Sequence, residues 1–202
     1  MAAVSRPMYD GNGTLVFDGK IGIFPFTFQE RAKRNSKNRV EGTFETKSIP
    51  SITKQVVKEM LISKIFPATK SKWPASVSKN ISIQQDNAHI KCTDHDFLNG
   101  ATIDGFSISL SQQPPNSPDL NVLDFGFFRS IQSLQQRKRA KKFDQLVLNV
   151  VQAWDEEPAI CLYDVWLSLQ AVMLEVLKNK GHNYFKLPHL GKKAQRAVGT
   201  LP

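Results

Sequence analysis

The order of hydrophobic patterns along the chain limits its fold more than any other feature. Short segments rich in Ile, Val and Phe dominate the first 110 residues, and amphipathic helical periods dominate the rest. We expect strands over 1–4, 15–17, 20–28, 80–85 and 106–110. We expect helices over 55–66, about 120–136, 143–154 and 162–180, the last closed by Gly181. This order predicts one compact unit of the α/β or α+β class.

Turn and capping residues separate these segments. Ser51 or Thr53 can cap the helix over 55–66, and Pro67 and the Trp73-Pro74 pair favour its end. The polar stretch 31–47 is typical of a loop, and 93–100 is typical of a short polar helix or loop.

Positive charge is concentrated in three stretches. The chain holds 27 Lys and Arg against 18 Asp and Glu, a formal net charge of +9, and the stretches 31–39, 137–142 and 178–196 carry five, five and six of the basic residues. Such stretches favour contacts with nucleic acid, but they can also serve nuclear import or form only a solvated face. The residues that we expect to contact nucleic acid are Arg31, Lys33, Arg34, Lys37, Arg39, Arg137, Lys138, Arg139, Lys141, Lys142, Lys192 and Lys193.

Several classes of protein are disfavoured. No apolar run approaches the roughly 20 residues that span a bilayer, and the N-terminal segment 1–13 lacks the basic-then-apolar order of a secretory signal. Cys92 and Cys161 make neither a disulfide framework nor a zinc site. We therefore expect an intracellular chain with no membrane partner.

Two acidic residues occupy positions suited to chemistry. Asp86 directly follows the strand over 80–85, where a carboxylate projects from the rim of a sheet. Asp124 lies in the first turns of the helix that opens after 117–119. Two carboxylates on neighbouring elements can share Mg²⁺ or Mn²⁺. Taken alone, an Asp at a strand end is also typical of a turn, and an Asp in the first turn of a helix is typical of a favourable interaction with the helix dipole.

The motifs around these aspartates carry a family resemblance. Gln84-Gln85-Asp86-Asn87-Ala88 is followed by Ser117-Pro118-Asp119-Leu120-Asn121, and Asp124 stands five residues after Asp119. Together they resemble the catalytic core of mariner-superfamily transposases, and the plant-type mariner-like branch is the most similar. Further similar stretches are 17–23, 54–64, 125–132 and 188–193, so the resemblance covers nearly the whole chain.

This resemblance implies a fold, a site and partners. It implies an RNase H-like mixed sheet flanked by helices, with 1–136 as a truncated catalytic core and 137–202 as a basic helical extension of the same domain. Asp86 matches the second of three carboxylates that hold two Mg²⁺ or Mn²⁺ ions, and Asp124 matches the third. Asp119 matches a residue that is no ligand in the family, so we expect it in a turn or at an N-cap. The implied partners are transposon ends and target DNA, in a nuclear and dimeric assembly.

One family motif is missing. The first catalytic Asp of the family lies in an Ile-Asp-Glu-Lys-Trp-like motif on the first strand, and no such motif occurs here. Asp10 and Asp18 are the early candidates, but both stand beside glycine in turn-like sequences. We therefore expect the chain to match the C-terminal portion of such a transposase, without its first strand or helix-turn-helix part, with weakened metal binding and no cleavage of its own.

Three interpretations of function remain open at this point. The chain is a truncated transposase domain, a non-catalytic nucleic-acid-binding remnant, or a self-associating helical protein. A further cluster, His89, Cys92 and His95, lacks a second ligand pair at zinc spacing, so we expect ordinary polar packing there.

Overall fold

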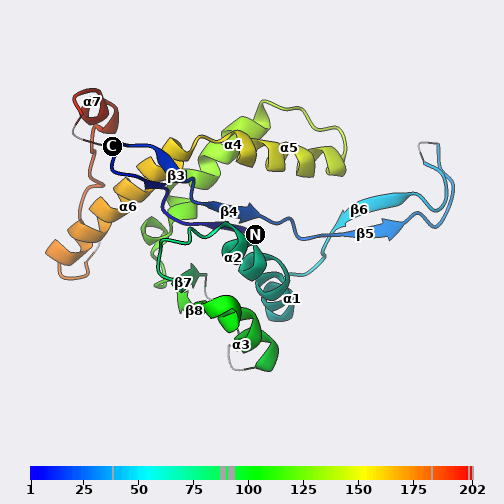
Figure 1. The fold of residues 1–202 in the computed structure, drawn as a ribbon. Helices are drawn as coiled ribbons and strands as arrows, with labels where there is room; N and C mark the ends of the chain where they lie inside the picture. Colours follow the sequence, from blue (N-terminus) through cyan, green and yellow to red (C-terminus); the bar gives the residue numbers. More distant parts are fainter. Residues whose placement is uncertain (38, 87–89, 91–93, 183, 200, 202) are drawn as a thin grey trace.

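The computed structural model describes residues 1–37, 39–86, 90, 94–182, 184–199 and 201. It confirms a mixed α/β fold, drawn in Figure 1. The described strands form four separate two-stranded ladders instead of one continuous hydrogen-bonded sheet. Three of these ladders are antiparallel, and the fourth is parallel.

Each ladder joins segments that lie near one another in sequence. The antiparallel ladders pair β1 (Ala2–Val4) with β4 (Lys20–Ile23), β2 (Met8–Tyr9) with β3 (Leu15–Phe17), and β5 (Thr27–Arg31) with β6 (Phe44–Ser48). The parallel ladder pairs β7 (Asn80–Gln85) with β8 (Ser107–Gln112) in a continuous register from Asn80 opposite Ser107 to Gln85 opposite Gln112.

The strand predictions are confirmed for 80–85 and 15–17, and they need two corrections. The expected strand over 20–28 divides into β4 and β5 around Pro25. The expected loop over 31–47 is wrong, because it contains β6. That segment, FETKS, has little hydrophobic patterning of its own, and its strand character comes from pairing with β5.

The first helix is longer than the sequence predicts. It runs without a break through α1 (Lys54–Met60), the π-helical turn η1 (Leu61–Ile65) and α2 (Phe66–Lys72). Thr53 caps it, since its hydroxyl accepts the Val56 N–H at 3.3 Å. Pro67 does not end this helix. It lies in the first turn of α2, directly after the wider turn η1, and π turns are one way for a helix to accommodate a lost backbone donor.

The remaining helices are short except for two. The short elements are α3 (His95–Thr102), η2 (Ile103–Gly105), η3 (Pro118–Leu120), η4 (Leu123–Phe127), α4 (Phe128–Gln136) and α7 (Lys192–Ala197). The long ones are α5 (Phe143–Glu156) and α6 (Ala159–Lys178). Helix α6 ends two residues before the predicted end, and both Lys180 and Gly181 adopt left-handed backbone conformations after it.

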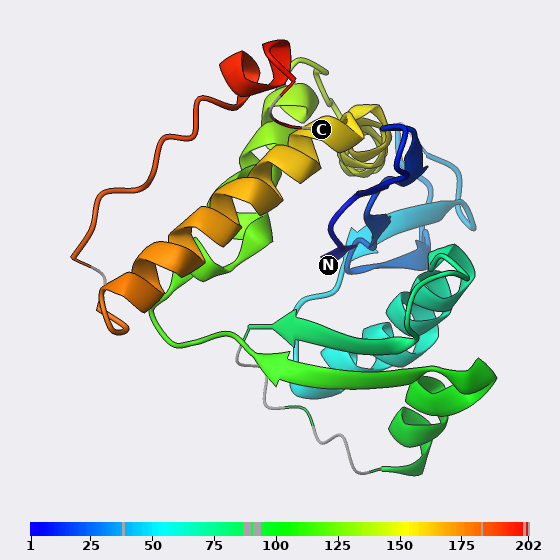
Figure 2. The same cartoon turned by 60° about the vertical axis from the view of Figure 1, so that its left-hand side comes forward.

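Two hydrophobic clusters lie on either side of β1. The first joins Phe66, Phe97 and Ile108 from α2, α3 and β8, and Ala3 packs against it. The second joins side chains of η4, α4, α5 and α6, and Ala2 packs against that one. Figure 2 shows the corresponding groups of helices, with α1 to α3 beside β7 and β8, and α4 to α6 on the other side. The second cluster crosses the expected boundary at residue 136, because residues on both sides of it share one core.

Helix α6 bears on the expectation that no segment of the chain spans a membrane. By length and composition alone it is long and apolar enough to cross a bilayer, although no unbroken apolar run of that length stands in the sequence. Core helices of globular proteins pass the same test. Such core helices are mostly buried, whereas 22% of the apolar window of α6 is buried, including Leu162 and Leu169. One such helix is by itself weak evidence for a membrane protein.

Candidate functional site

The two aspartates that the sequence singles out lie in one hollow of the surface. Asp86 directly follows β7, and Asp124 is the second residue of η4. Both line a cavity of about 290 Å³, together with Asn121 and the loop 113–118. The parallel pairing of β7 with β8 explains their proximity, because it brings the end of β7 and the loop that leaves β8 to the same edge of the ladder.

Two glutamines hold this loop against the end of β7. The Gln84 side-chain amide donates to Gln113 Oε1 and to the Leu120 carbonyl, the latter at 2.9 Å. Gln113 is buried; its backbone N–H donates to the Gln85 carbonyl at 2.8 Å, and its side-chain amide donates to the Ser117 carbonyl. The hollow is thus shaped by a hydrogen-bonded scaffold that continues the strand ladder.

Asn121 positions the second aspartate. Its Nδ2 donates to Asp124 Oδ2 at 2.8 Å, while its Oδ1 accepts the Leu123 N–H at 3.0 Å and starts the helical segment. Partial burial raises the pKa of the Asp124 carboxyl above its ordinary value, and the negative charge of Asp86 raises that pKa further. The two carboxylates therefore lie close enough for their charges to interact.

The donor chemistry fits a hard divalent cation, but it is incomplete for two ions. Carboxylate oxygens are the ligands that Mg²⁺ and Mn²⁺ prefer. Within the described part of the chain, no group of three or more His, Cys, Asp or Glu side chains converges on one point. Among these residues, Asp86 and Asp124 share the hollow but are not part of a three-carboxylate site.

The other acidic candidates belong to turns. Asp10 Oδ1 accepts the backbone N–H groups of Asn12 at 2.9 Å and Thr14 at 2.8 Å, and Asp18 Oδ1 accepts the Lys20 N–H at 2.9 Å. These hydrogen bonds confirm the turn roles expected for both. Asp119 lies in the single turn η3, where the N-cap position belongs to Ser117.

The first basic stretch lies on the β5–β6 hairpin. Lys33, Arg34 and Lys37 are exposed in the connection between the two strands and make no ion pair within the described residues. Arg39 pairs with Glu45, and the Arg31 guanidinium lies 4.9 Å from the centre of the Phe44 ring.

The second basic stretch forms the connection from α4 to α5. Lys138 pairs with Glu156 at 2.6 Å, while the other four basic residues are exposed. Arg139, Lys141 and Lys142 line a second, shallow hollow at the start of α5.

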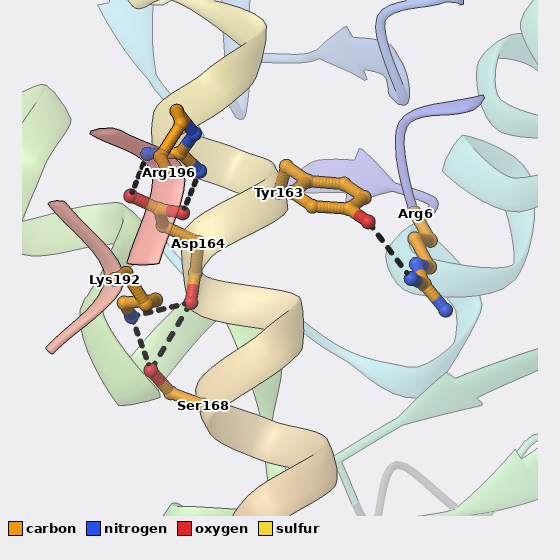
Figure 3. A network of polar contacts seen from close by, with 6 residues as sticks. All are labelled: Arg6, Tyr163, Asp164, Ser168, Lys192 and Arg196. Atoms are coloured by element: carbon orange, nitrogen blue, oxygen red, sulfur yellow. Dashed lines mark hydrogen bonds and ion pairs between the residues drawn. The ribbon is translucent and has the colours of Figure 1, made fainter. Parts of the chain in front are cut away.

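The third basic stretch is partly engaged inside the protein, as Figure 3 shows. Lys192 Nζ donates to the Asp164 carbonyl at 2.7 Å and to Ser168 Oγ, and Arg196 pairs with the Asp164 carboxylate at 2.6 Å. These contacts hold α7 against α6. The Lys192 ammonium is therefore used in hydrogen bonds within the protein, whereas Lys193 is exposed.

All the predicted site residues are described, whereas the motif residues Asn87 and Ala88, and His89 and Cys92 of the cluster expected in polar packing, lie outside the described residues. Residue-type reasoning also missed the structural roles of Gln84, Gln113 and Asn121. A signal was present for two of them, because Gln84 and Asn121 stand inside the motifs that carry the family resemblance. Comparisons of the chain with protein-family models, curated proteins and solved structures find no match.

Proposed function

We propose that this chain is a portion of a mariner-like transposase core that binds DNA and does not cut it by itself. In this proposal Asp86 and Asp124 are two of the three metal-binding carboxylates of an RNase H-like catalytic site. The alternative is a remnant whose basic stretches bind nucleic acid and whose aspartates have no remaining role.

The observation that carries the proposal is the meeting of Asp86 and Asp124 in one hollow. They stand 38 residues apart in the sequence, and nothing in their local turns requires them to share a cavity. The resemblance identifies the same two residues as a ligand pair from their motifs alone. The geometry and the motifs are independent arguments for the same pair.

The chemistry of the pair explains why catalysis is not expected. A divalent ion bound there would supply a Lewis acid for a phosphate oxygen. Two-metal cleavage needs both ions in place, and the two carboxylates that converge here are too few for that. What the chain can do with its own residues is hold one ion weakly and present exposed cations to a phosphate backbone.

The first experiment measures metal binding and cleavage together. Mn²⁺ is titrated into the whole chain while ¹H–¹⁵N spectra are recorded, and we expect selective broadening around Asp86 and Asp124. The same broadening should disappear in Asp86→Asn and persist in Asp119→Asn, a matched control in the neighbouring turn. Broadening that is unaffected by Asp86→Asn would contradict the metal site.

The second experiment tests the division between binding and cleavage. A labelled DNA duplex should bind with an affinity whose logarithm falls linearly with the logarithm of salt concentration, and it should stay intact with Mg²⁺ or Mn²⁺ present. Metal-dependent cleavage that Asp86→Ala abolishes would overturn the proposal of an inactive chain. Absence of any salt-dependent binding would overturn the DNA-binding part.

Self-association is a second candidate, favoured by the apolar surface of α6. Leu174 and Leu177 are 58% and 74% exposed, which is unusual for adjacent turns of an apolar helix. We expect light scattering after size exclusion to report a dimer. A monomer at all accessible concentrations would remove this candidate.

A further inference from the structure

The β5–β6 hairpin meets the rest of the described structure where β6 contacts α5, and it projects beyond that contact (Figure 1). Its strands pair only with each other among the described ladders, and Figure 1 shows them projecting away from the helices. Most side chains from Thr27 to Ser48 are exposed, including Phe28 and Phe44. The hairpin buries little apolar surface, so its projection is not explained by core packing.

The strand register divides the hairpin into two faces of different charge. On one face, Phe28 lies opposite Lys47 and Glu30 lies opposite Glu45. The charges on this face are neutralised locally, because Lys47 pairs with Glu30 at 2.5 Å and Arg39 pairs with Glu45. The hydrogen bond and the charge of Lys47 also lower the pKa of the Glu30 carboxyl.

The opposite face carries hydrogen-bond donors and no acidic residue. Gln29 lies opposite Thr46, and its Nε2 donates to Thr46 Oγ1 at 2.8 Å. Arg31 lies opposite Phe44, with its guanidinium above the aromatic ring. A guanidinium that stacks on a ring keeps its N–H groups directed outward and available.

The connection between the strands adds unneutralised cations. Lys33, Arg34 and Lys37 are exposed there and form no ion pair with any residue that the structure describes. Residues 27–48 carry six basic and three acidic residues, a net charge of +3. The hairpin therefore combines a donor-bearing face with a cationic tip.

We propose that the β5–β6 hairpin is a DNA-binding arm that lies in the major groove of duplex DNA. The groove is about 12 Å wide and admits a two-stranded antiparallel ribbon. Gln29 and Arg31 are residue types that hydrogen-bond to adenine and guanine edges there, and the tip cations contact the phosphates on either side. This inference rests on the proposed DNA binding, and it specifies which part of the chain binds and in which groove.

The test compares the whole chain with two matched double variants by fluorescence anisotropy across a salt series. Lys33→Ala/Arg34→Ala removes two tip cations, and Lys54→Ala/Lys64→Ala removes two exposed lysines from the first helix. Loss of two phosphate contacts lowers the slope of log affinity against log salt by about 1.8 on duplex DNA. We expect this decrease for the tip variant and an unchanged slope for the control. Circular dichroism checks that both variants fold.

The groove is tested with modified DNA and with single strands. Duplex DNA whose cytosines carry glucosylated hydroxymethyl groups has a filled major groove, so we expect it to bind several-fold more weakly than unmodified duplex. Arg31→Ala should reduce that difference. We also expect duplex to bind more tightly than a single strand of the same sequence.

Each contrary outcome has a distinct meaning. Equal affinity for modified and unmodified duplex overturns the major-groove placement. Preference for single strands, lost in Phe44→Leu, overturns it in favour of base stacking on the exposed ring. If the chain binds DNA but the tip variant behaves like the control, the hairpin is not the DNA-binding arm, while the proposed function stands. If the chain binds no DNA, the proposed function fails as well.

Discussion

The β1–β4 ladder has seven strand residues and the β7–β8 ladder has twelve, and the two are packed differently in the fold. The β1–β4 ladder is covered on both faces, since Ala3 packs toward one hydrophobic cluster and Ala2 toward the other. The β7–β8 ladder is covered on one face only. Its isoleucines pack on the helices, while Ser82, Gln84 and Ser109 on the alternate positions are exposed.

This difference shows how the protein separates stability from chemistry. Where both faces are apolar, the ladder is enclosed and anchors two groups of helices. Where apolar and polar residues alternate, one face stays open, and the polar end of the strands holds Asp86 and its glutamine scaffold. Substitutions should therefore cost most stability around the first ladder, and they should mainly change electrostatics at the end of the second.

The largest loss of stability should come from changing the buried residues that pack against the β1–β4 ladder. Phe127 is fully buried and packs edge-to-face on Trp154 with ring centres 5.5 Å apart. Phe127→Ala should lower the free energy of unfolding by about 3–5 kcal/mol, measured with urea. The next residue offers a matched control, because Phe128 is 42% exposed. A similar loss for Phe128→Ala would mean that the two-sided enclosure is not what stabilises this region.

The buried ammonium of Lys20 should have the next largest effect. Its Nζ donates to the carbonyls of Trp154, Asp155 and Glu157 at 3.0–3.1 Å, and it thereby joins β4 to the end of α5. Lys20→Met should reduce the free energy of unfolding by about 1.5–3 kcal/mol, because charge-assisted hydrogen bonds and the favourable interaction with the helix dipole are lost. The exposed Lys64→Met serves as control, and equal stability of the two variants would contradict this role.

A smaller effect is expected where α7 is fastened to α6. The Arg196–Asp164 pair is only partly buried, with 29% and 25% of the two side chains exposed. Arg196→Gln should cost about 0.5–1 kcal/mol, and the loss should shrink in 1 M salt because part of it is electrostatic. Lys193→Gln on the same helix should cost less. An effect of Arg196→Gln that is independent of salt would argue that its packing matters more than its charge.

The smallest effect should be a change in the pKa of Asp124, at the exposed end of the β7–β8 ladder. Asp86→Asn should lower the pKa of the Asp124 carboxyl toward its ordinary value of 3.8, because a neighbouring negative charge is removed. Carboxyl-detected NMR titration measures this shift, and Asp119→Asn should leave the pKa of Asp124 unchanged. An unchanged pKa in Asp86→Asn would show that the two aspartates do not interact.

The same titration has a consequence for stability. Because the pKa of Asp124 is raised in the folded state, that state holds its proton more tightly than the unfolded chain. Stability should therefore decrease slightly as the pH rises from below 3.8 through the folded-state pKa. Asp124→Asn should remove this slope, and a slope that persists would have to come from another group.

Much of the local structure followed from sequence, and its exceptions have physical causes. The strand over 80–85 was predicted to the residue because alternating apolar positions match one buried face. Strand β6 was missed because FETKS becomes a strand only by pairing with β5 across a twelve-residue connection. Lys192 was assigned to nucleic acid from its basic neighbours, but its three-dimensional neighbours are Asp164 and Ser168, 28 and 24 residues earlier.

The features of the candidate site also divide into those that local sequence predicts and those that depend on tertiary packing. The sequence by itself determined that Asp86 ends a strand, that Asp124 lies near the start of a helix, and that the basic residues fall into three stretches, because such features depend on residues a few positions apart. Only the tertiary structure decided that the two aspartates share a hollow, that Gln113 is buried beneath its loop, and that the first basic stretch projects on a hairpin. These outcomes depend on which distant segments pack together, and that choice is made by burial and hydrogen bonding over the whole chain.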